Sequence, residues 1–194
     1  MKKTVLTLLF GMTAAVLGAA EAQNLVPNGD FEASPAELKK TFYETGNRMT
    51  FIQEQPVNNH CAKVEITKFH IDKADGKQGA SSQLNFKLKD LKPNTVYSFS
   101  FDLTGTAPRF MVGIKYKGKQ LKRTITAPEQ QKKNGVNFYL DTGAEWTTYA
   151  GEFKTEEGGD HVFTISLWHN TRYGKMFYSI GDYILIDNIS VQEK

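Results

Sequence analysis

Residues 97–103 read YSFSFDL, with an apolar side chain at every second position and a polar one between. This period of two is typical of a β-strand that buries one face and turns the other to water. Many such strands with little helical periodicity predict two antiparallel sheets packed face to face, an all-β sandwich. The other segments that predict strands are 63–67, 83–88, 109–116, and about 136–140, 146–154, 161–168 and 183–191.

Between these strands the chain offers one short helix and one long loop. Ser34 can cap a helix and Pro35 suits its first turn, so we expect a single turn there. Residues 118–135 are polar and lysine-rich and predict a long loop or insertion. Its charge could attract an acidic glycan over long range, although a solvated loop explains the same composition.

The amino end has the pattern of a cleavable signal peptide. Lys2 and Lys3 precede an apolar stretch that ends in small residues at 20–22, which predicts cleavage before Gln23. We therefore expect residues 1–22 to be removed and residues 23–194 to form one domain that is secreted or periplasmic. No later segment approaches the roughly 18 apolar residues that a membrane span needs.

Charge and cysteine content limit the partners and the means of stabilisation. The formal net charge of +3 is too small to indicate a nucleic-acid partner. Cys61 is the single cysteine, which rules out an internal disulfide. Stability must then come from packing or from a bound metal, and the oligomeric state stays open.

Four features in order resemble a known family. They are residues 24–32 (NLVPNGDFE), residues 91–101 (LKPNTVYSFSF), Trp146 at the start of a strand, and residues 186–191 (IDNISV). Together they resemble carbohydrate-binding modules of the family 4, 9 and 22 type over nearly all of the mature chain. The resemblance implies a galactose-binding-like jelly-roll β-sandwich that binds a polysaccharide or glycan, with Trp146 and Tyr97 in the core.

At the position where that family usually has a tryptophan, soon after the opening segment, this chain has Phe42 and Tyr43. The chain therefore departs from the family at this contact position, and the resemblance does not identify the ligand.

Asp187 is the most informative acidic residue, because it lies in an apolar strand where a lone carboxylate is costly. The resemblance implies a structural calcium ion (Ca2+) near the first and last strands, held by Glu32 and Asp187, with Asp30 as a third candidate. Calcium suits such carboxylates, since it takes 6–8 oxygen ligands. Alternatively, Asp187 accepts backbone hydrogen bonds at a bulge, Glu32 is solvated and Asp30 only shapes the turn after Gly29.

A sugar site needs an exposed aromatic face, because the apolar side of a pyranose ring stacks on a planar side chain. Alternation places Trp168 opposite the core, just before a polar loop. The alternatives are that Trp168 covers the core edge, or that outward polar residues of other strands line a concave groove. The residues predicted to contact sugar are Trp168, His169, Asn170, Arg172, Tyr173 and Tyr178.

The leading hypothesis is an exported, non-catalytic carbohydrate-binding module. The chain has none of the common hydrolase, metalloprotease, redox or dinucleotide motifs. A small glycoside hydrolase or lyase remains an alternative, since it needs only two carboxylates, for which Asp102, Glu65 and Glu152 are candidates. A surface adhesin that binds another protein is the third possibility.

Overall fold

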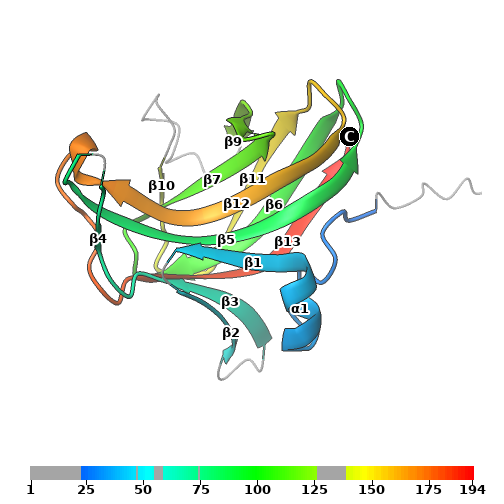
Figure 1. The fold of residues 1–194 in the computed structure, drawn as a ribbon. Helices are drawn as coiled ribbons and strands as arrows, with labels where there is room; N and C mark the ends of the chain where they lie inside the picture. Colours follow the sequence, from blue (N-terminus) through cyan, green and yellow to red (C-terminus); the bar gives the residue numbers. More distant parts are fainter. Residues whose placement is uncertain (1–22, 47, 55–58, 74, 126–138) are drawn as a thin grey trace, which may run out of the picture.

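The computed structural model describes residues 23–46, 48–54, 59–73, 75–125 and 139–194 (Figure 1). The predicted signal peptide, most of the predicted strand at 136–140 and part of the predicted long loop lie outside these residues. The described part of the chain contains no helix that is long and apolar enough to cross a membrane.

The described strands form two sheets, in which neighbouring strands run antiparallel. The first sheet has seven strands: β1 (Phe42–Gly46), β5 (Gln78–Leu91), β12 (Gly159–Asn170), β7 (Arg109–Tyr116) and β10 (Leu140–Asp141) in spatial order, with β4 (His70–Ile71) beside β5 and β8 (Lys119–Gln120) beside β7. The second has six: β2 (Arg48–Glu54), β3 (Asn59–Glu65), β13 (Tyr183–Glu193), β6 (Val96–Gly105), β11 (Thr147–Lys154) and β9 (Arg123–Ile125). The prediction of an all-β, antiparallel jelly-roll sandwich is confirmed.

Aromatic rings join the two sheets across the core. Phe163 on β12 stacks on Phe86 of β5 with ring centroids 4.9 Å apart, and meets Phe99 of the second sheet edge-on at 5.1 Å. Nearby, Tyr149 of β11 meets Phe110 of β7 edge-on at 4.8 Å. Because the pairs Phe163–Phe99 and Phe110–Tyr149 are buried and each joins one sheet to the other, these contacts fix the distance between the layers.

Among the described residues, the α-helix α1 (Pro35–Thr41) precedes β1 and is longer than the single turn predicted. Its start follows the sequence pattern, since the Glu37 carboxylate accepts hydrogen bonds from the backbone N–H and the hydroxyl of Ser34. Leu38 buries its side chain in the core, which holds the helix against the sandwich.

Of the two aromatics expected in the core, Tyr97 is buried, whereas Trp146 is 41% exposed. The prediction for Trp146 is wrong because of its position in the alternation. On β11 the buried rings are Tyr149 and Phe153, which point to the same face of the strand. Trp146 precedes the strand by one residue, at a position that alternation assigns to the opposite face.

Replacing Phe163 with alanine tests the inter-sheet core. We expect the Phe163→Ala variant to lose about 3–5 kcal/mol of unfolding free energy, because its ring contacts both sheets. Urea unfolding measures the change, with Val162→Ala, the adjacent outward residue, as the control that loses little. Equal losses for the two variants would contradict this assignment of faces.

Candidate functional site

The outer face of the seven-stranded sheet carries a shallow hollow centred on β12. Its inward residues Phe163, Ile165 and Leu167 are fully buried, so the residues between them face away from the core. In Figure 1, β5 and β12 are long curved strands whose ends rise above their middle, which makes this outer face concave. The hollow measures about 250 Å³ and extends to Trp168.

Strand register arranges the outer face around this hollow in rows across β5, β12 and β7, and the rows from Thr164 to Trp168 hold most of the residues that line it. Residues paired across antiparallel strands share a face, so each row presents its side chains to the same side. From Val162 to Trp168 the rows extend about 20 Å at the rise of a β-strand. In that order the rows are Lys87, Val162 and Lys115; Asn85, Thr164 and Gly113; Gln83, Ser166 and Met111; and Ser81 with Trp168.

One side of the hollow is walled by the hairpin of β7 and β8, which carries Gln120, and by β9 of the second sheet, which carries Arg123. The side chain of Gln120 lies over Gly113, where an added Cβ would come within 3.3 Å of it. The Gln120 amide is oriented with its oxygen toward two donors. In this orientation the oxygen accepts hydrogen bonds from the Ile114 N–H at 3.0 Å and from Arg123 Nη1 at 3.2 Å. Gly113 therefore leaves room for the hairpin to fold onto the floor.

Aromatic side chains stand at the end and at the side of this floor. Trp168 is partly exposed, and its ring centroid lies 5.8 Å from that of Tyr173, which is 65% exposed. Tyr43, 40% exposed, shares the outer face because it pairs with Asn85. Sequence reasoning did not include Tyr43 in the site, since its place beside the floor depends on the pairing of β1 with β5.

The loop residues predicted beside Trp168 divide into exposed and buried ones. His169 is buried, with its Nδ1 3.0 Å from the Tyr139 hydroxyl, and burial raises the pKa of Tyr139 to about 12. Tyr178 is also buried and donates its hydroxyl hydrogen to the Arg109 carbonyl at 3.0 Å, and burial raises its pKa too. Both side chains contact protein rather than the outer surface, so they position the loop.

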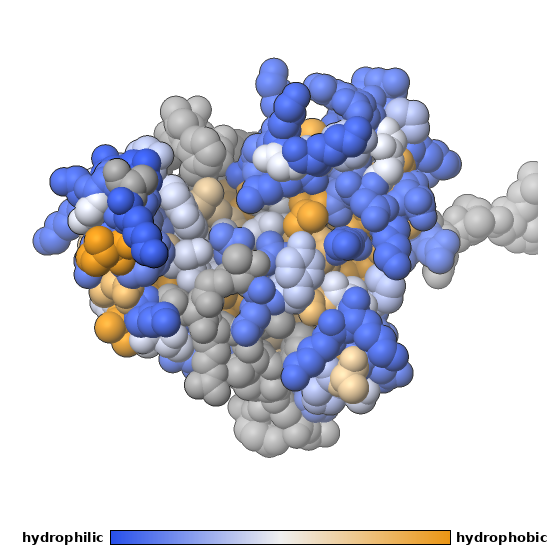
Figure 2. Space-filling model, viewed as in Figure 1, coloured by the Kyte–Doolittle hydropathy of each residue, from blue (hydrophilic) through white to orange (hydrophobic). Residues whose placement is uncertain are grey.

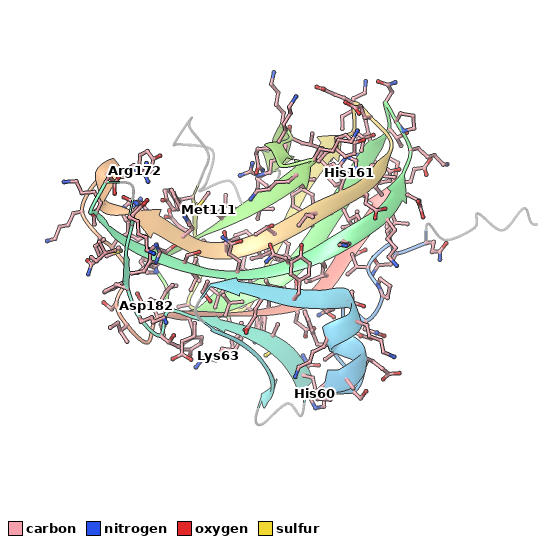
Figure 3. The ribbon with its side chains drawn as sticks, viewed as in Figure 1. His60, Lys63, Met111, His161, Arg172 and Asp182 are labelled. Carbon is pink, nitrogen blue, oxygen red and sulfur yellow. The ribbon has the colours of Figure 1, made fainter. Side chains whose placement is uncertain are left out.

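Asn170 and Arg172 are tied to the turn after β4. The buried Asn170 amide donates to Asp72 at 3.0 Å and accepts from the Arg172 N–H at 2.9 Å. The Arg172 guanidinium forms ion pairs with Asp72 and Asp75. Figure 3 shows Arg172 and His161 at opposite ends of β12 with Met111 between them. Of the six predicted contact residues, Trp168 and Tyr173 present open aromatic faces.

The residues predicted to hold calcium lie at a different place, near the start of β3. Asp187 is buried and accepts hydrogen bonds from the Asn59 amide and the Asn188 N–H. Glu32 accepts from the His60 N–H and contacts the His60 ring, both at 2.9 Å. Burial raises the pKa of Asp187, and the charges of Asp102 and Glu32 add to this effect.

Hydrogen bonds from His60 instead lower the pKa of Glu32. Asp30 accepts a hydrogen bond from the Glu32 N–H at 3.4 Å. This contact shapes the turn after Gly29, which is the role considered for Asp30 as the alternative to calcium binding. Within the described ranges, no group of three or more His, Cys, Asp or Glu side chains is arranged to hold a metal ion. A cation here would depend on oxygens beyond the two carboxylates.

The carboxylates considered for catalysis all belong to the second sheet. Asp102 accepts from Thr148 and Asn188, while Glu65 pairs with Lys63 and Glu152 with Lys194. These acids lie on β6, β3 and β11, and none of them lines the hollow. Of the described residues that line the hollow, none is Asp or Glu.

Replacing Asn170 with alanine tests the positioning role of the buried loop residues. We expect Asn170→Ala to lower the unfolding free energy by about 1–3 kcal/mol, because Asp72 and the Arg172 N–H lose a buried partner. Thermal unfolding measures the loss, with the exposed Lys175→Ala on the same loop as the control. An unchanged Tm for Asn170→Ala would contradict this role.

No family model and no curated protein matches the chain. Among solved structures, it is similar to TmCBM61, determined in complex with β-1,4-galactotriose, at 15% identity and a TM-score of 0.57 over 89% of this chain and 100% of that one. It is also similar to the enzymatically active domain of tailspike protein 4 of bacteriophage CBA120, at 14% identity and a TM-score of 0.51 over 88% of this chain and 21% of that one. The chain therefore has the β-sandwich fold found in carbohydrate-binding modules.

Proposed function

We propose that this chain is an exported, non-catalytic carbohydrate-binding module that holds a polysaccharide or glycan in the hollow of the seven-stranded sheet. The observation that carries the proposal is Trp168, partly exposed at the end of a polar, concave floor. An indole face covers the apolar side of a sugar ring, and a flanking amide such as that of the partly exposed Gln83 bonds the sugar hydroxyls.

The similarity to TmCBM61, whose structure holds a galactotriose, supports carbohydrate as the ligand class. The pattern of residues 1–22 supports export, which would bring the protein to glycans outside the cell.

A binding role is favoured over hydrolysis by the composition of the hollow. Glycoside hydrolysis commonly uses two carboxylates that flank the scissile bond, and the described lining offers Lys, Arg, amide and hydroxyl groups instead. Because the chain is also similar to part of a tailspike enzyme domain, hydrolysis is the alternative that the binding experiment must test. The chain corresponds to only 21% of that protein.

The two tryptophans provide a matched test of the sugar site. In binding assays over a glycan panel, we expect Trp168→Ala to weaken binding about tenfold or more, because the stacking surface is lost. Trp146→Ala, which removes the exposed tryptophan beside β11, should leave affinity unchanged. After incubation with the protein, chromatography should show that every glycan keeps its original length.

Three results would count against the proposal. Equal affinity for the Trp168→Ala variant and the unmodified protein would move the site elsewhere, and shortened glycans would indicate a hydrolase or lyase. The absence of binding to any glycan would favour a protein-binding surface instead.

We further propose that a calcium ion binds between Glu32 and Asp187. The two carboxylates come from the opening segment and from β13, and the charge of Glu32 contributes to the raised pKa of Asp187. A divalent cation would relieve this repulsion and supply a link between chain ends in a protein with one cysteine. The competing explanation is that the N–H donors of β3 satisfy both carboxylates by themselves.

A chelator distinguishes these explanations. If calcium binds, the Tm should fall in EDTA and recover with added calcium, because a ligand of the native state stabilises it. Asp187→Asn should remove this response, whereas Asp160→Asn, an exposed acid on β12, should keep it. The response should also fade on acidification, since the raised pKa of Asp187 lets protons compete early. A Tm indifferent to EDTA would reject the calcium ion.

A further inference from the structure

Positive charge gathers on the outer face at the end opposite Trp168, where Lys115 lines the hollow and Lys87 lies beside it. Lys87 and Lys115 flank Val162 on the two neighbouring strands, which places their Cα atoms about 10 Å apart. Both lysines are exposed and point to the concave side. Among the described residues neither forms an ion pair, so both ammonium groups can reach a ligand.

Arg123 of β9 adds a third cation to the same hollow. Its Nη1 donates to Gln120, and Gln120 is held in turn by the Ile114 N–H, so the guanidinium is fixed by the hairpin rather than swinging in water. Burial lowers the pKa of Arg123, yet an arginine remains charged at neutral pH. A partly buried, positioned guanidinium is a strong donor to planar anions.

None of the described residues that line the hollow is Asp or Glu, and Glu152, in the adjoining pocket that Arg123 also lines, forms an ion pair with Lys194. Elsewhere in the described chain several cations have an acidic partner: Lys63 with Glu65, Arg109 with Asp141, and Arg172 with Asp72 and Asp75. Three like charges gathered in a concave surface repel one another and raise the local potential, which an anion would relieve.

We propose that Lys115 and Arg123 in the hollow, together with Lys87 beside it, bind an anionic group of the glycan, a uronic-acid carboxylate or a sulfate ester. This inference rests on the proposed function and specifies its substrate class. Because about 20 Å of β12 separates Val162 from Trp168, the anionic group and the ring on Trp168 belong to different sugars of one chain. The ligand is therefore an acidic oligosaccharide or polysaccharide.

The test compares matched charged and neutral polymers by isothermal titration calorimetry. The pairs are polygalacturonate against its carboxyl-reduced form, and dextran sulfate against dextran. We expect the charged member of at least one pair to bind about tenfold more tightly or better at low salt, with the advantage shrinking as sodium chloride is added. Preference in the first pair alone identifies a carboxylate, and in the second alone a sulfate ester.

Lysine variants locate the preference in the hollow. Lys87→Met and Lys115→Met keep most of the side-chain length and remove the charge, so each should lower affinity for the charged polymer severalfold to tenfold. Lys39→Met, an exposed lysine of α1, makes the same change of net charge and should have no effect. Because Lys87 and Lys115 are exposed, their variants test the proposal even if an Arg123→Met variant does not fold.

The failures of the two proposals are distinguishable. If charged and neutral polymers bind equally, or if Lys39→Met weakens binding as much as Lys87→Met, the anionic site is wrong while the carbohydrate-binding module stands. If no polymer of either kind binds, both proposals fall together.

Discussion

The structure depends on the division of β12 between two environments. Phe163, Ile165 and Leu167 are buried against the second sheet, and that burial forces Thr164, Ser166 and Trp168 to the opposite side. A shift of one residue in register would exchange the two sets, so core packing and the composition of the hollow are specified together. The neighbouring strands follow the same rule, since Phe86 and Ile114 face the core while Asn85 and Gly113 face outward.

The opening segment and the last strand form a seam on the other sheet. The Leu25 N–H bonds the Val191 carbonyl and the Ile189 N–H bonds the Gly29 carbonyl, both at 2.8 Å. A Cβ on Gly29 would lie 2.0 Å from the Ile189 carbonyl oxygen, which explains the glycine in this motif. Since the seam belongs to β13 and the hollow to β12, stability at the chain ends and ligand contact on the outer face can change independently.

The pattern of alternation predicted most of the fold, because burial of one strand face is a local property. Residues 97–103 form part of β6, and the strands predicted at 83–88, 109–116, 161–168 and 183–191 are all present. The prediction for Trp146 was wrong because it followed motif similarity instead of the alternation of side chains that buries Tyr149 and Phe153. The helix α1 is longer than the predicted single turn, and the burial of Leu38 in the core stabilises the added residues.

The candidate site was only partly predictable, since it is assembled from distant segments. Trp168 could be placed outward from its own strand, but the sequence does not show that Asp72 and Asp75 hold Arg172, or that Tyr139 meets His169. The association of Met111 and Lys115 with Gln83 and Lys87 likewise depends on β5 and β7 both lying beside β12, which no single strand reveals.

The predominantly hydrophilic surface in Figure 2 also shows an apolar patch over the β4 end of the molecule, where Ile71 is 64% exposed. Nothing in the described structure indicates a partner for it. The concave face of the seven-stranded sheet therefore remains the surface on which the functional account rests.

The most direct test of this account is a nuclear magnetic resonance titration of the protein with an oligosaccharide drawn from a polymer that it binds. The account predicts that the Trp168 indole N–H and the backbone amides of 81–87, 111–115 and 162–168 shift together and saturate at one affinity. Shifts confined to 174–182, or to the strands of the second sheet, would contradict it.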